Sequence, residues 1–254
     1  KDDDSSDLGA FGAELLAFCA AMFGLVIVDD IILLFIFWEL TTILSFLLIG
    51  YSGHRIYVRR SALQALIVTT AGGLAMFVGL LTAAYEADST RISEIVEAGP
   101  ELLASGNPTV VVAIVLILIG AISKSALIPL HFWLPGAMAA PTPVSAYLHA
   151  AAMVKAGLYL IARFAPAFAP SATWQAMVLI LGLGTMIVGA YRALRQVDIK
   201  LVLAYGTISQ LGFLTVLIGI GTQAAMAAGL ALLLSHGLFK AALFLVVGII
   251  DHAT

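Results

Sequence analysis

Charged residues are scarce in this chain. Only 11% of its 254 residues are Asp, Glu, Lys or Arg, whereas 62% are hydrophobic, and the mean hydropathy is +1.09. A soluble domain is about half apolar and about a quarter charged. The composition therefore predicts a chain whose exterior faces lipid rather than a soluble domain with an unusually large core.

Cysteine is nearly absent as well. Cys19 is the only one, and its apolar surroundings suggest a small buried hydrophobe. A single cysteine excludes a disulfide framework or a cysteine-based metal cluster. No haem, flavin or iron–sulfur pattern and no phosphate-binding loop is present. We therefore expect no cofactor, no metal site and no catalytic enzyme, and the net charge of −3 gives no reason to expect a nucleic-acid partner.

The chain begins at Lys1, and neither end resembles a signal peptide. We expect it to be an internal part of a longer protein.

Long apolar runs dominate what is present. A helix needs about 20 apolar residues to cross the hydrocarbon core, and such spans are helical because the backbone must satisfy its own hydrogen bonds in lipid. Gly182, Gly184 and Gly189 would let neighbouring helices approach closely. The sequence thus predicts an all-α polytopic membrane bundle. Its spans are expected near residues 8–28, 31–50, 61–84, 108–130, 142–164, 174–191, 200–220 and 223–250.

Loop charges predict the orientation. The loop at 51–60 carries three arginines, and the loop after the sixth span carries Arg192, Arg195 and Lys200. Four spans separate these loops, so they lie on one side, which the positive-inside rule makes cytoplasmic. The acidic loop at 86–107 falls on the other side.

The fourth span should break. Pro129 removes a backbone donor five residues after Lys124. Leu134–Gly136 and Pro141–Pro143 follow, and broken helices at membrane depth line cavities or ion sites. Arg163, near a helix end, is expected to extend its charge to the interface.

Six ionisable residues fall inside the predicted spans. Each costs at least about 2.5–3.5 kcal/mol near the bilayer centre unless it is paired or hydrated. A passive membrane scaffold would not need so many of them. They are Glu39, Lys124, His149, Lys155, His236 and Lys240.

Each also has a purely structural interpretation. Glu39 and Lys124 could form an ion pair that holds two helices in register. His149 could be a satisfied core residue. His236 and Lys240 share one helix face, which suits either an interhelical contact or a proton relay.

The functional interpretation rests on the six ionisable residues taken together. On a straight helix His149 and Lys155 would lie about 9 Å apart along the axis and about 120° apart around it, so water would have to link them. Moving the Glu39 carboxylate nearer to or farther from Lys124 would make the lysine hold or release its proton. That is the physics that proton transport requires.

Several segments resemble a known family. They are Trp38–Thr41, Lys124–Arg163, Leu203–Tyr205 with Ile208–Gly212, and Ser235–Lys240. The chain resembles the antiporter-like subunits shared by respiratory NADH:quinone oxidoreductase (complex I) and Mrp-type multisubunit Na⁺/H⁺ antiporters. The resemblance implies that Glu39 pairs with Lys124 of a broken helix, and that His149 with Lys155 and then His236 with Lys240 carry the proton onward.

The same resemblance implies a domain organisation. The spans would be helices four to eleven of a fourteen-helix core built from inverted five-helix repeats. Residues 8–164 would form the first repeat and 172–254 the truncated start of the second. Gly136 and Ala140 stand where relatives often carry acidic residues, which puts that part of the entry path in doubt.

Finer points favour one branch. Met153–Gly157, with its lysine, Val247–His252 and Trp38–Thr41 look most like the large A-type component of Mrp antiporters. The resemblance implies a bacterial inner-membrane protein that exchanges Na⁺ for protons, driven by the proton motive force, beside other membrane subunits. The alternative is a proton-pumping membrane subunit of complex I.

Overall fold

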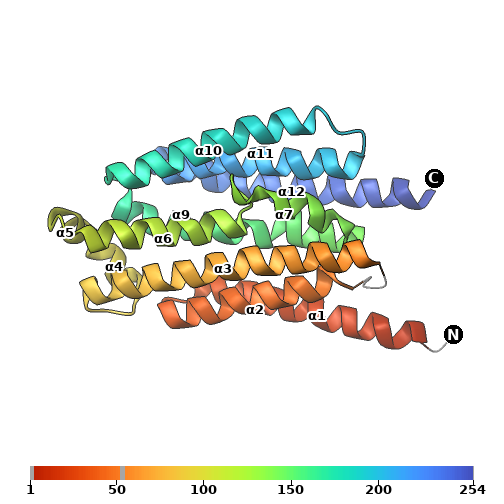
Figure 1. The fold of residues 1–254 in the computed structure, drawn as a ribbon, viewed down its shortest axis with the longest axis horizontal. Helices are drawn as coiled ribbons and strands as arrows, with labels where there is room; N and C mark the ends of the chain where they lie inside the picture. Colours follow the sequence, from red (N-terminus) through yellow and green to blue (C-terminus); the bar gives the residue numbers. More distant parts are fainter. Residues whose placement is uncertain (1–2, 52–54, 254) are drawn as a thin grey trace.

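The computed structural model describes residues 3–51 and 55–253, which form a bundle of roughly parallel and antiparallel helices (Figure 1). Within these residues there is no β-strand, only an isolated bridge between Asp30 and Arg91. The α-helices of the first half are α1 (Asp3–Ile27), α2 (Ile31–Ile49), α3 (Ile56–Ala87), α4 (Ile92–Glu97), α5 (Gly99–Ala104) and α6 (Pro108–Lys124). Those of the second half are α7 (Trp133–Gly136), α8 (Thr142–Val144), α9 (Ala156–Phe168), α10 (Ala172–Ala193), α11 (Ile199–Gly219) and α12 (Gln223–Ala253).

The all-helical prediction is confirmed. Seven helical segments of the described chain are long and apolar enough to cross a membrane, and Pro108–Lys124 forms a shorter apolar helix. These eight segments correspond to the eight predicted spans.

Three of the long helices, α2, α6 and α11, begin at side-chain caps. Asp30 accepts hydrogen bonds from the backbone of Ile32 and Leu33 at the start of α2, and Asp198 does the same at the start of α11. Asn107 caps α6 by accepting from Thr109 N at 3.1 Å. Such caps satisfy orphan N–H groups at the first turn and fix where each apolar run begins.

The connections alternate between the two ends of the bundle. The end of α2, the start of α3 and the α10–α11 connection lie at the same end of the bundle as the start of α1 and the end of α12, whereas α4 and α5 lie at the opposite end (Figure 1). This agrees with the predicted sidedness, in which the two basic loops share one face and the acidic loop lies on the other.

Glycines bring α10 and α11 together. A Cβ on Gly212 would lie 2.5 Å from the carbonyl oxygen of Gly182, and one on Gly189 would lie 2.6 Å from Ser209 N. Close packing through Gly182 and Gly189 is therefore confirmed. The same prediction is wrong for Gly184, because nothing lies within 4 Å of its Cβ position and it makes no close approach.

The fourth predicted span is shorter than expected. It ends at Lys124 rather than at residue 130, and the break predicted from Pro129 is confirmed. The chain then continues through short turns, η1 (Leu130–Phe132), α7, η2 (Ala137–Ala139) and α8.

The fifth predicted span is not one α-helix. It begins with α8 and a π-helix, η3 (Ser145–Ala151), passes through a 3₁₀ turn, η4 (Met153–Lys155), and continues as α9. Ala152, between η3 and η4, has non-helical angles of φ −121° and ψ −73°. A π-helical turn is uncommon and often marks a functional site.

Candidate functional site

Lys124 is the last residue of α6 and its side chain is fully buried, with 0% exposure. Its Nζ donates to Trp38 O at 2.6 Å, Thr41 Oγ1 at 2.5 Å and Thr42 Oγ1 at 3.0 Å, all on α2. It also lies 4.5 Å from the centre of the Trp38 ring. An ammonium group has three donors, so this site satisfies a protonated lysine completely.

The threonines are held in place by their own helix. Thr41 Oγ1 and Thr42 Oγ1 both donate to Trp38 O, at 2.7 and 3.1 Å. Their lone pairs then remain for Lys124. One turn of α2 thus supplies all three oxygen acceptors, the backbone carbonyl of Trp38 and the hydroxyls of Thr41 and Thr42.

Glu39 does not pair directly with Lys124. Within the described residues, the ion pairs shorter than 4.0 Å are Arg163–Asp29 and Arg91–Glu94. Glu39 Oε1 is buried without a hydrogen-bond partner, although its charge lies close enough to interact electrostatically with Lys124. The expected Glu39–Lys124 ion pair is therefore not formed in this structure, because α2 backbone and hydroxyl oxygens occupy the ammonium.

The break after Lys124 is held from three sides. Ser125 Oγ donates to Val154 O at 2.7 Å. Trp133 Nε1 donates to Ser123 O at 2.9 Å, and Ile128 N donates to Thr185 Oγ1 at 2.9 Å. These bonds satisfy backbone groups that the interrupted helix leaves unpaired.

His149 lies in the π-helix, buried, with neither ring nitrogen hydrogen-bonded. Its ring packs edge-on to Trp133 with centroids 6.3 Å apart. Lys155 lies in the next turn and donates to Ala150 O at 2.6 Å. The straight α-helix on which the predicted spacing of His149 and Lys155 is based is not formed, because the π-helix, Ala152 and the 3₁₀ turn intervene.

His236 and Lys240 are both buried on α12, as expected of residues that share a face. Lys240 Nζ donates to Leu203 O of α11 at 3.2 Å. Both ring nitrogens of His236 lack a partner, and its ring lies within electrostatic range of Lys155 and Lys240. His236 therefore lies near both lysines.

The six predicted residues fall into two groups with His149 separate from both. Glu39 and Lys124 lie at the α2–α6 contact, and Lys155, His236 and Lys240 lie where α9, α11 and α12 meet. Trp133 contacts His149 and also bonds the end of α6. In the described part of the chain no hydrogen bond joins two of the six directly.

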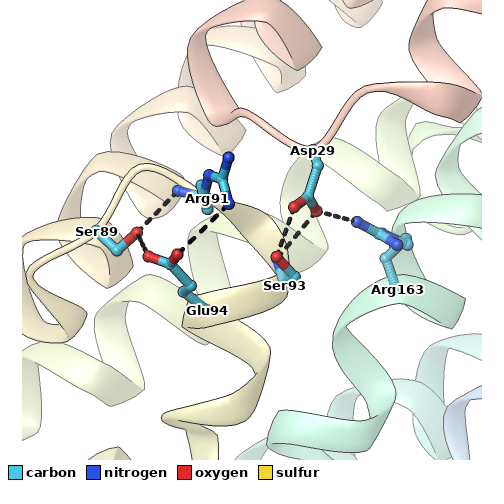
Figure 2. Close-up of polar contacts among 6 residues, drawn as sticks. All are labelled: Asp29, Ser89, Arg91, Ser93, Glu94 and Arg163. Carbon is cyan, nitrogen blue, oxygen red and sulfur yellow. Dashed lines mark hydrogen bonds and ion pairs between the residues drawn. The ribbon is translucent and has the colours of Figure 1, made fainter.

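Arg163 is partly exposed, and its guanidinium Nη2 donates to Asp29 Oδ1 at 2.6 Å (Figure 2). The extension of its charge to the membrane interface stays a prediction. Asp29 Oδ1 also accepts from Ser93 N at 3.0 Å. Hydrogen bonds from Ser93 and the charge of Arg163 hold the pKa of the Asp29 carboxyl below its usual range.

Asp29, Ser93 and Arg163 form an outer clasp at the end opposite the termini. It joins the α1–α2 turn, α4 and α9, and a neighbouring group on α4 includes an Arg91–Glu94 ion pair of 3.8 Å (Figure 2). Sequence reasoning missed the clasp, since Asp29 and Arg163 are far apart along the chain.

Sequence reasoning also missed two features inside the spans. Thr41 and Thr42 were not predicted to bind Lys124, although their position within a conspicuous turn of α2 was a signal. Glu14 on α1 has a buried carboxylate oxygen without a partner, and only its charge inside an apolar run could have revealed it.

A cavity of about 800 Å³ opens at the end that carries both termini. Arg55 and Lys200 line it, together with Ala140 and Thr142. Lys200 Nζ donates to Ala140 O at 2.7 Å. At Ala140 the chain therefore offers a backbone carbonyl to a lysine.

The family described as NADH:quinone oxidoreductase/Mrp antiporter, TM matches residues 28–254. The chain belongs to this family. It is a multi-pass membrane protein, and the predicted resemblance to Mrp antiporters is confirmed.

Named relatives and a solved structure support this family assignment. The chain is 48% identical over 242 residues to the A/B component of a probable K⁺/H⁺ antiporter of Rhizobium meliloti (strain 1021), covering 95% of this chain and 24% of that protein. It is 46% identical over 263 residues to the A component of the Na⁺/H⁺ antiporter of Bacillus subtilis (strain 168), covering 99% and 32%. A chain of the Mrp complex from Dietzia sp. DQ12-45-1b superposes with a TM-score of 0.88 at 44% identity, covering 94% and 26%.

A more distant structure shares the fold. A chain of the membrane-bound sulfane sulfur reductase, an archaeal respiratory membrane complex, superposes with a TM-score of 0.83 at 26% identity, covering 93% of this chain and 48% of that one. The chain spans about a quarter to a third of the length of the two antiporter relatives named above.

Proposed function

We propose that this chain is the proton-conducting core of the large A-type component in an Mrp-type monovalent cation/proton antiporter, which exchanges Na⁺ for protons under the proton motive force. The observation that carries the proposal is Lys124, a fully buried ammonium at the break of α6 with all its donors satisfied by α2. An intramembrane ionisable residue at a broken helix is a functional site by default. The relatives, named as antiporter components, support a transporter rather than an enzyme.

The proton path starts from Lys124. The proton held there leaves when the lysine loses its oxygen ligands or when the charge of Glu39 moves away. One oxygen of Glu39, Oε1, has no hydrogen-bond partner and faces the bare backbone of Gly73, while the carboxylate has a hydrogen bond with Thr70 that such a movement would break. The proton then passes through water to His149 and Lys155.

The second group carries the proton onward. Lys155 passes it toward His236 and Lys240 on α12, and the unpaired ring nitrogens of His236 are available to water. Buried polar atoms without a protein partner are normally met by ordered water, which is what a proton relay through this region requires.

The two-repeat organisation, with residues 8–164 and 172–254 as its parts, belongs to the same proposal. The break of α6 divides the first part in the middle of the bundle, and α10 to α12 would begin the second.

We propose that other membrane subunits and the bilayer surround the bundle in the bacterial cell membrane. Large apolar side chains cover its outside, among them Leu16, Ile180 and Leu238, each about 70% exposed. Lipid or neighbouring subunits would cover these faces.

A second candidate function is a proton pump module driven by redox chemistry in partner subunits. The superposition on a chain of an archaeal respiratory membrane complex supports this second candidate. The two functions share the same buried charges and differ in their source of energy.

Exchange measured without electron donors separates the two. Inverted membrane vesicles carrying the complete complex would be energised with an imposed pH gradient, with NADH and quinone omitted, and then given Na⁺. The proposal predicts dequenching of a pH-sensitive dye on addition of Na⁺, and no response in vesicles lacking the complex. Absence of any cation-dependent response in vesicles with assembled complex would favour the redox-driven pump.

A further inference from the structure

Three glycines lie against the charged ends of side chains from other helices. A Cβ on Gly237 of α12 would lie 2.6 Å from Lys155 Nζ, and one on Gly206 of α11 would lie 3.0 Å from Lys240 Nζ. A Cβ on Gly73 of α3 would meet Glu39 Oε1. In each case the missing side chain leaves the space in which a buried charged group lies.

Gly237 differs from glycines that serve helix packing. The Cβ position of Gly157 meets Ala121 O at 2.2 Å, and that of Gly212 meets backbone of α10. At Gly237, leaving aside its own helix, the atoms of the described chain within 4 Å of the Cβ position are Nζ and Cε of Lys155. The absence of a side chain there therefore makes room for an ammonium group and not for a helix backbone.

Gly237 also directly follows His236, whose ring lies within electrostatic range of Lys155. The Lys155 ammonium donates a hydrogen bond to Ala150 O, five residues earlier in the chain. On its other side it lies against α12 at Gly237, where no side chain covers the helix backbone. The ammonium thus lies between its own carbonyl and the helix that carries the next two ionisable residues.

We propose that Gly237 is a positioning residue of the proton path, which keeps the Lys155 ammonium against α12 beside His236. The inference rests on the proposed proton-conducting function and adds a residue that carries no charge and touches no proton. Gly206 gives Lys240 the corresponding space on α11.

A methyl group at position 237 would displace the ammonium rather than the helix. Carbon and nitrogen atoms in contact stay about 3.5 Å apart, so Nζ must retreat from the new Cβ. Lysine ends a flexible four-carbon stem, and the retreat needs no backbone shift. Alanine is also a better helix former than glycine, so Gly237→Ala should leave folding and assembly intact.

The test compares Gly237→Ala with Gly184→Ala in the complete complex. Gly184 is a matched control, because it also lies in a long helix and nothing occupies the space around its Cβ position. We expect Gly237→Ala to assemble normally and to lower the maximal exchange rate at least about tenfold, since small misplacements of reacting groups cost this much or more. The rate is expressed per assembled complex, so a loss of folded protein cannot imitate this effect, and the Na⁺ concentration for half-maximal exchange should stay unchanged.

One further variant, Lys155→Met, separates this inference from the proposed function. It should abolish exchange if the proposed path is right. Wild-type exchange per assembled complex in Gly237→Ala while Lys155→Met is inactive would overturn the role of Gly237 alone. Wild-type exchange in Lys155→Met would overturn the proposed path itself.

Discussion

Individual ionisable side chains in this bundle differ in how many protein atoms hold them. Lys124 has three oxygen acceptors, whereas Lys155 and Lys240 each bond one backbone carbonyl. The rings of His149 and His236 bond none. A lysine with three oxygen acceptors depends on protein atoms for its hydrogen bonds, whereas a buried imidazole without partners needs water to exchange a proton. The dependence of these groups on hydration therefore increases from Lys124 to the two histidines.

At the residue scale, the outer clasp gives a prediction for Asp29→Asn. The substitution keeps the side-chain shape and removes the charge that binds Arg163. Because Arg163 and Asp29 are 36% and 42% exposed, the loss of stability should stay below about 1 kcal/mol. Thermal unfolding of the purified complex would measure it.

The same clasp has a defined pH dependence. The pKa of Asp29 is lowered in the folded protein, so its contribution is complete above the ordinary carboxyl value of about 3.9 and is lost as pH falls below it. The difference between wild type and Asp29→Asn should be equal at pH 5 and pH 8. A difference that shrinks between pH 8 and pH 5 would contradict this assignment.

Two irregular elements position the buried groups. The broken segment after α6 ends the helix at Lys124, and the π-helix η3 places His149 against Trp133. Both interruptions free backbone groups that neighbouring helices must satisfy, as Thr185 of α10 does for Ile128. The irregular backbone is therefore part of the site and depends on α10 for its shape.

At the element scale, Thr185→Val tests this dependence. Thr185 is fully buried, and the substitution would leave Ile128 N–H without an acceptor at a cost of about 1–3 kcal/mol. The complex should unfold at a lower temperature. Thr82→Val is the control, because the Thr82 hydroxyl donates to Val78 O of its own helix. Equal losses of thermal stability in the two variants would show that the hydrogen bond from Ile128 to Thr185 does not stabilise the break.

The sequence predicted the break but not the π-helix. Pro129 and the charge of Lys124 are strong local signals for an interruption. Residues 145–151 are mostly apolar and continue the pattern of a buried span, and a π-helical turn has no comparable residue signature. The ligands of Lys124 were missed for a different reason, because a contact between Lys124 and Thr41 depends on how α2 and α6 pack, which periodicity does not determine.

The bundle places its features at opposite ends and in between. The cavity lined by Arg55 and Lys200 lies beside the start of α3 and the end of α12, whereas the outer clasp joins the α1–α2 turn to α4 and α9. The buried charges lie between them at the meeting of α2 and α6 and of α9, α11 and α12. Because the chain covers about a quarter to a third of its curated relatives, this arrangement is one part of a longer protein.

The central claim is that Lys124 carries protons in exchange for cations. The direct test measures Na⁺-dependent proton movement in inverted vesicles carrying the complete complex, with Lys124→Ala compared with Val112→Ala on the exposed side of the same helix. Lys124→Ala should assemble and lose exchange, whereas Val112→Ala should exchange as wild type does. Full exchange by assembled Lys124→Ala would contradict the account.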